Sequence, residues 1–264
     1  MKRSLQWLYF VALLLLLALG VALYATERSL AAREAAEQRQ RVHLHLQRIR
    51  DELELHLLGD LQLAQGMISV ITLEPEITQA RFEKAAEALF KGHTQIRNIA
   101  AAPGMVISLM APLAGNEAAL GLDYRATPAQ FSAAEQARVS RSIVVAGPLK
   151  LKQGGEGVAV RFPVYLSTQK GEVFWGLVSA VIDTEKLYRN SGLLHPNQAI
   201  ELALRGRDGR GGAGEVFFGR TGLFSEAPLI EEIRFPQGSW QIAAIPKEGW
   251  SEVVVLRLGP RWRL

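Results

Sequence analysis

The feature that most constrains this chain is a run without charged side chains near its N-terminus, from Ser4 to Thr26. Residues 8–19 within it are almost wholly aliphatic. With a rise of about 1.5 Å per residue, a helix over this run spans a hydrocarbon core of about 30 Å. Aromatic side chains suited to the membrane interface lie near its two ends, at Trp7, Tyr9 and Tyr24. Residues 1–26 are therefore predicted to form a cytoplasmic tip and a transmembrane helix in the lipid bilayer.

The orientation follows from the flanking charges. Lys2 and Arg3 favour a cytoplasmic N-terminus, which places the body in the periplasm of a bacterial cell, anchored in the inner membrane by a single pass. A cleaved signal peptide is the competing interpretation, and it would make the chain a secreted structural protein. Leu23 stands at the outer position of the cleavage region Leu23-Tyr24-Ala25, where a small residue is expected, so we favour an uncleaved anchor.

The charge distribution argues against nucleic acid as a partner. The formal net charge is +4, but five basic residues lie at the two ends of the chain: Lys2, Arg3, Arg257, Arg261 and Arg263. Without them the body carries 25 basic and 26 acidic residues, and it contains no basic stripe interleaved with aromatic residues. Cysteine is absent, which excludes disulfides and thiolate metal sites.

A long helix is predicted to leave the membrane. Residues 27–71 contain no proline and are rich in Ala, Leu, Glu, Gln and Arg. A stripe of apolar residues recurs at spacings of three and four: Val42, Leu46, Ile49, Leu53 and Leu57. We expect its membrane-proximal half to form a coiled-coil seam of a homodimer, with packing against the chain's own body as the alternative, and Leu57 onward to pack against that body. After Pro75 a second amphipathic helix is predicted at residues 77–90, so residues 27–90 form the helical stalk region.

From Ile99 onward the pattern indicates strands with inserted helices. Runs rich in β-branched and aromatic residues predict strands at residues 105–110, 157–165, 173–181, 199–205, 215–219 and 238–245. Helices are predicted at residues 127–141 and from Asp183. The order predicts an α+β fold with two subdomains, residues 91–185 and 186–250, each built on an antiparallel sheet.

No arrangement of residues typical of catalysis is present. The histidines, at 43, 45, 56, 93 and 195, lack the spacing of a metal site. The glycine-rich segments 153–157 and 206–214 lack the Lys-Ser/Thr of a phosphate loop, so both are interpreted as hairpin loops. We expect no enzymatic activity from these residues, no metal and no cofactor.

Several short motifs occur in a familiar order: Ala102-Pro103-Gly104-Met105-Val106-Ile107, Ala111-Pro112-Leu113, Gly115 to Tyr124, Ala146-Gly147-Pro148-Leu149, Gln153-Gly154-Gly155, Arg161 to Tyr165, Phe174-Trp175-Gly176, Val181-Ile182-Asp183, Gly238-Ser239-Trp240 and Pro246 to Trp250. Over about residues 60–250 this succession resembles the CHASE domain. That domain is the extracellular sensory part of bacterial diguanylate cyclases and histidine kinases and of plant cytokinin receptors.

The resemblance implies a membrane-anchored sensor that binds a small ligand. It implies two PAS-like subdomains on the long helix, a ligand cleft in the membrane-distal one (residues 91–185), a membrane-proximal one (residues 186–250), and a dimer. It also implies a return membrane helix leading to a cytoplasmic output domain. Residues 251–264 would be the start of that return segment, and the sequence stops at Leu264. Two alternatives follow: a fragment of a diguanylate cyclase or histidine kinase, or a chain whose output domain has been lost.

The ligand site is predicted between two neighbouring segments of the first subdomain. Residues 143–151 and 158–165 mix apolar and polar side chains, as ligand pockets do. The predicted ligand-binding residues are Ile143, Val145, Ala146, Val160, Phe162 and Tyr165. Because side chains alternate along a strand, Arg161 faces away from Val160 and Phe162 and is the weaker candidate. For Ala146 and Val160 a plain core position is an equal alternative.

Overall fold

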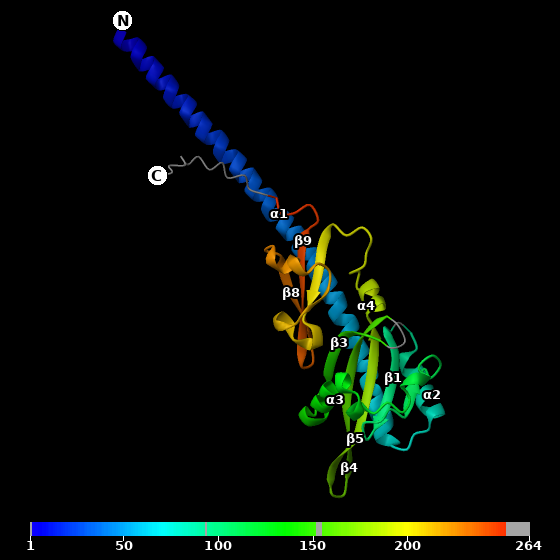
Figure 1. Ribbon diagram of the computed structural model, residues 1–264. Coiled ribbons are helices and arrows are strands. Elements are labelled where there is room, and N and C mark those ends of the chain that lie inside the picture. Colours follow the sequence, from blue (N-terminus) through cyan, green and yellow to red (C-terminus); the bar gives the residue numbers. More distant parts are fainter. Residues whose placement is uncertain (1, 93, 152–154, 252–264) are drawn as a thin grey trace.

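A single long helix organises the molecule. The computed structural model describes residues 2–92, 94–151 and 155–251. Helix α1 (Lys2–Leu73) runs unbroken from the apolar N-terminal run through the predicted stalk. Its first part projects away from the rest of the chain (Figure 1), and no residue of its most apolar window is buried. In the described residues, α1 is the one helix long and apolar enough to cross a membrane.

The end of α1 farther from the apolar run carries a five-stranded antiparallel sheet, which we call the distal sheet. Its strands follow the order β2-β1-β5-β4-β3. The elements of this half are α2 (Gln79–Phe90), β1 (Ile96–Pro103), β2 (Leu109–Ala111), the 3-10 turns η1 (Glu117–Ala119) and η2 (Tyr124–Ala126), α3 (Pro128–Ser140), β3 (Val144–Lys150), β4 (Glu156–Thr168), β5 (Gly171–Asp183) and α4 (Thr184–Asn190).

A four-stranded antiparallel sheet, the proximal sheet, lies nearer the apolar run (Figure 1). Its strands follow the order β7-β6-β9-β8. They are β6 (Ile200–Arg205), β7 (Val216–Phe218), β8 (Leu229–Phe235) and β9 (Gly238–Pro246). Short 3-10 turns connect them: η3 (Arg207–Gly209), η4 (Gly211–Ala213) and η5 (Thr221–Ser225). The predicted α+β fold with two antiparallel sheets is confirmed.

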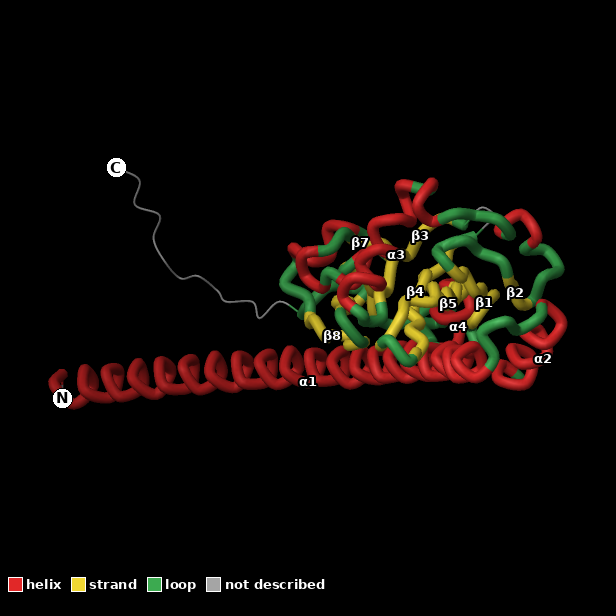
Figure 2. Tube along the Cα trace, turned by 90° about the horizontal axis from the view of Figure 1, so that it is seen from below, coloured by secondary structure: helices red, strands yellow, loops and turns green. Residues whose placement is uncertain are grey.

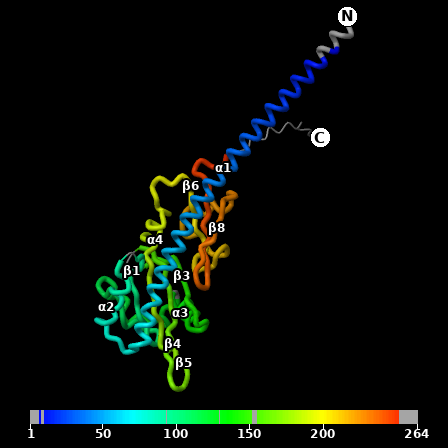
Figure 3. Tube along the Cα trace, turned by 180° about the vertical axis from the view of Figure 1, so that it is seen from behind, coloured from blue at the N-terminus to red at the C-terminus, as the bar shows by residue number. Residues whose placement is uncertain are grey.

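Helix α1 lies along one face of both sheets (Figures 2 and 3). The whole apolar stripe from Val42 to Leu57 is buried in the same core as side chains from both sheets. Strand β8 lies beside this part of the helix, where the Arg234 amide donates to the Glu54 carboxylate at 2.9 Å. The prediction that the stripe forms a dimer seam is therefore wrong, because the chain's own β8 covers it. The prediction of self-packing from Leu57 onward is confirmed.

Most elements expected from the sequence are present, and the errors have local causes. The strand predicted at residues 105–110 is wrong: Met105 adopts a positive φ of 75° in a turn, so only Leu109–Ala111 joins the sheet. Strands β1 and β8 are absent from the set predicted from the sequence. The predicted return segment at residues 251–264 lies outside the described residues from 252 onward.

Candidate ligand cavity

Strand alternation gives the distal sheet two distinct faces. On β4, Val158, Val160 and Phe162 belong to the core shared with α1. Ala159 and Arg161, which alternate with them, lie on the opposite, outer face. The outer face of the sheet is crossed by residues 112–143, which include η1, η2 and α3.

Between the outer face and this covering segment lies a cavity of about 420 Å³. Its size falls within the range of small-molecule sites, about 300–1,000 Å³. Side chains of β1, β4, β5 and η2, the end of β3 and the segment before η1 contribute to it. The lining residues are Asn98, Ala100, Ile107, Met110, Gly115, Ala118, Ala119, Leu122, Tyr124, Gln130, Leu149, Lys150, Leu151, Ala159, Arg161, Ser179 and Val181.

Two pairs of polar side chains are held in fixed positions on the cavity wall. The Tyr124 hydroxyl donates to the Ser179 hydroxyl at 2.9 Å, and both residues are buried. The Asn98 amide donates to the Asn116 side-chain oxygen at 2.9 Å. Mostly apolar walls with a few oriented polar groups are the usual composition of a ligand site.

Arg161 is the most unusual residue of the cavity. Arg161 is only 2% exposed. Its Nη2 donates a hydrogen bond to Gln130 Oε1 at 3.3 Å. Its Cζ lies 5.5 Å from the centre of the Tyr124 ring. Within the described residues, neither Nε nor Nη1 has a hydrogen-bond partner and no carboxylate forms an ion pair with it. Burial lowers the pKa of the Arg161 guanidinium, although arginine stays protonated in proteins. The cavity thus contains a buried cation that forms no ion pair with any described carboxylate.

None of the six residues predicted from the sequence lines this cavity. Val145, Val160 and Phe162 pack in the core with α1, and Ile143 lies against the same core. Ala146 pairs with Ala159 across β3 and β4, so it shares the outer face without reaching the cavity. The Tyr165 hydroxyl donates to the Arg138 carbonyl at 2.5 Å, near the C-terminal end of α3. Nothing in this arrangement measures ligand binding by these residues, which stays a prediction.

Sequence reasoning identified the alternation on β4 but chose the opposite face. Arg161, the weaker candidate, is the residue that reaches the cavity. Its signal was a charged residue within an otherwise apolar strand, at residues 157–165. A charge placed there requires a partner or a ligand.

A second hollow lies between α1 and the proximal sheet. This groove of about 600 Å³ is bordered by charged residues that are all exposed: Arg41, Lys247 and Glu248. Exposed charges are solvated by water and need no ligand. We therefore take the cavity of the distal sheet, with its buried arginine, as the candidate site.

Comparison with known proteins agrees with this architecture. Residues 15–218 match the CHASE domain family. No curated protein sequence matches the chain.

Solved structures share the fold at low sequence identity. An extracellular ligand-binding receptor from Desulfohalobium retbaense is 15% identical with a TM-score of 0.60; the match covers 77% of this chain and 40% of that one. The ligand-binding domain of the Pseudomonas aeruginosa amino-acid chemoreceptor PctC, in complex with GABA, is 13% identical with a TM-score of 0.56. That match covers 78% of this chain and 98% of the PctC domain. The extracellular domain of a histidine kinase, rpHK1S-Z16, is 15% identical with a TM-score of 0.53. That match covers 82% of this chain and 96% of the kinase domain.

Proposed function

Because the chain belongs to the CHASE domain family, we propose that it is a membrane-anchored extracytoplasmic sensor that binds a small ligand in the cavity beside Arg161. The observation that carries the proposal is a cavity lined by a buried arginine side chain that forms no ion pair within the described residues. Such an arrangement costs folding free energy and is retained where it serves binding. The GABA complex of the chemoreceptor PctC is consistent with small-molecule recognition on this fold.

The proposed topology places the sensor in the periplasm. Residues 1–26 anchor it in the bacterial inner membrane, and residues 27–90 form the stalk region. Residues 91–185 form the membrane-distal subdomain and residues 186–250 form the membrane-proximal one. In the proposal both subdomains are PAS-like. In an intact receptor, ligand binding is passed through residues 251–264 and a return helix to a cytoplasmic output domain. The alternative is that this chain is the sensory fragment of a diguanylate cyclase or histidine kinase whose catalytic part is a separate domain.

A homodimer is part of the proposal, with a seam different from the buried stripe. Leu44 and Leu55 are 58% and 66% exposed on α1. They are eleven residues apart, close to three turns of about 3.6 residues, so they share one face of the helix. That face lies away from the sheets and is available to the same face of a second copy.

The cavity assignment is tested by filling it. Ala159→Leu adds bulk to a lining residue, whereas Ser132→Leu changes an exposed position on α3 and serves as the control. The full chain in detergent is screened by thermal unfolding against small organic acids, amines, amino acids and purines. We expect compounds that raise the melting temperature of the wild type and of Ser132→Leu but not of Ala159→Leu. Equal stabilisation of all three proteins would place the binding site elsewhere.

A further inference from the structure

The charges that line the cavity are all of one sign. Of its described lining residues, Arg161 and Lys150 are cationic and none is Asp or Glu. Lys150 is exposed, whereas Arg161 is buried. A buried cation is stable only with a partner that neutralises it. The lining residues supply no such partner.

The acidic residues around the site are engaged elsewhere. The Asp123 carboxylate is bound by its neighbour Arg125, with Nη2 at 2.8 Å and the backbone amide at 2.9 Å. Asp208, in η3, accepts from the Gly147 amide at 2.7 Å. Asp208 acts on Arg161 through space but forms no ion pair with it. Neither carboxylate neutralises the guanidinium.

Resting on the proposed function, we infer that the ligand is a small organic anion whose carboxylate, or a group of the same geometry, binds the free donors of Arg161. A guanidinium and a carboxylate make charge-assisted hydrogen bonds of matching planar geometry. The Tyr124 and Ser179 hydroxyls lie on the same wall as further polar contacts. The rest of the ligand contacts apolar side chains such as Ile107, Met110 and Leu122.

The same inventory argues against a zwitterionic amino acid. An ammonium group in the cavity would find no carboxylate among the described lining residues to neutralise it. It would also place a second cation near Arg161. The inferred ligand is therefore an acid without an ammonium group, which differs from GABA in the chemoreceptor complex.

Matched probes separate charge from shape. Benzoate, phenylacetate and hexanoate are compared with their amides, with benzylamine and hexylamine, and with phenylalanine. Each is titrated into the full chain in detergent at low ionic strength. We expect at least one acid to bind and to raise the melting temperature, while its amide, the amines and phenylalanine bind at least tenfold more weakly.

Variants at Arg161 identify the contact. Arg161→Met should weaken binding of that acid by about 30-fold or more, since removing one partner of a buried charge pair costs about 2–5 kcal/mol. Arg161→Lys keeps the charge and should retain the preference for acid over amide. It also provides the test if the Met variant does not fold.

Each outcome has a distinct meaning. Equal binding of acid and amide to the wild type would overturn the anion inference and leave the cavity assignment standing. Unchanged acid binding by Ala159→Leu would overturn the cavity assignment itself. Binding by none of the acids would overturn the anion inference, while an amine or amide that binds the wild type and not Ala159→Leu would preserve the proposed function.

Discussion

The distal and proximal sheets rest on the same helix, yet their outer faces differ. Residues 112–143 cross the outer face of the distal sheet and enclose the cavity. Among the described residues, only short turns cover the proximal sheet, over a small apolar cluster: Ala203, Leu223, Ala243 and Ile245. The longer segment over the distal sheet is thus the one with a cavity beneath it.

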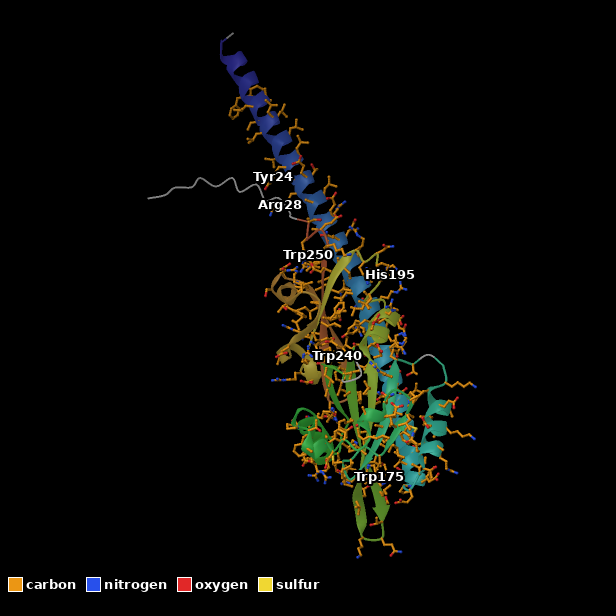
Figure 4. The ribbon with its side chains drawn as sticks, turned by 45° about the vertical axis from the view of Figure 1, so that its right-hand side comes forward. Tyr24, Arg28, Trp175, His195, Trp240 and Trp250 are labelled. Carbon is orange, nitrogen blue, oxygen red and sulfur yellow. The ribbon has the colours of Figure 1, made fainter. Side chains whose placement is uncertain are left out.

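Buried polarity follows the same division. The distal strands bury the side chains of the polar residues Asn98, Arg161 and Ser179. In the described strands β6–β9 the polar and charged residues are not buried, although the Trp240 indole N–H is buried without a hydrogen-bond partner. The fully buried Trp240 is labelled in Figure 4. Its ring packs edge-on against those of Phe217 and Phe235, with ring centres 5.2 Å apart in both pairs. Polar groups in a core reduce stability unless they are satisfied. The two sheets thus differ in the side chains that they bury: polar and charged residues in the distal sheet, and an aromatic cluster around Trp240 in the proximal sheet.

A turn of the proximal region joins the two sheets at the wall of the cavity. Asp208 accepts from the Gly147 amide, and Arg207 Nη1 donates to the Pro148 carbonyl. The Gly147 amide and the Pro148 carbonyl lie directly before Leu149, which lines the cavity. Gly147 has a φ of 105°, and a Cβ there would come within 2.8 Å of the Leu149 amide, so the close approach requires glycine. This contact therefore joins the wall of the cavity to the turn that follows β6.

The largest expected effect concerns the helix that both sheets share. Leu46→Glu places a carboxylate in the core between α1 and β8. Truncation of a buried leucine alone costs about 2–5 kcal/mol, and the buried charge adds to that loss. We predict that the variant does not fold, as measured by circular dichroism and thermal unfolding.

The matched control is the exposed face of the same helix. Leu44→Glu with Leu55→Glu should leave the melting temperature nearly unchanged and convert the proposed dimer to a monomer in sedimentation. A folded Leu46→Glu protein that becomes monomeric would instead restore the buried stripe as the dimer seam.

The next effect tests whether the proximal sheet contributes stability without binding. Trp240→Ala removes its largest fully buried side chain and should cost about 3–5 kcal/mol. Thermal unfolding with and without the acid probe measures both roles, and Trp240→Phe serves as a milder control. The acid should still bind the folded fraction with wild-type affinity. A loss of affinity in that fraction would mean that the two sheets do not have separate roles.

A smaller effect is expected at the contact between the sheets. Asp208→Ala removes the acceptor of the Gly147 amide and should cost about 1–2 kcal/mol in thermal unfolding. Asp208→Asn retains a side-chain oxygen and tolerates the positive φ of 60° at this position, so it should lose less. Equal melting temperatures for the Ala variant and the wild type would show that the contact does not join the sheets.

The smallest effect is a pH dependence where α1 meets β1. Burial raises the pKa of Asp60, although Thr94 and the Gln95 amide donate to its Oδ1 at 2.7 and 3.2 Å. A raised pKa means that the folded state binds more protons than the unfolded state, so this residue's contribution to stability falls as pH rises above 3.8. Thermal unfolding across pH 4–8 should show a smaller loss of stability with rising pH in Asp60→Asn than in the wild type. Parallel curves for the two proteins would contradict it.

The sequence predicts the architecture better than the site. Helix and strand periodicities within residues 27–90 and 157–181 reflect local burial, so most of these elements were found. The face of β4 that meets α1 depends on contacts distant in sequence. Val160 and Phe162, which the sequence predicts as ligand-binding residues, pack toward α1. For the same reason the stripe from Val42 to Leu57 could not reveal that β8 covers it.

The central claim is that the outer face of the distal sheet binds an organic anion at Arg161. A crystal structure of the chain with the most stabilising acid tests it most directly. The account predicts the carboxylate within hydrogen-bonding distance of Arg161 Nε or Nη1, with the apolar part against Ile107 and Leu122. An acid bound in the groove between α1 and the proximal sheet, beside Arg41 and Lys247, with the cavity free of it, would contradict the account.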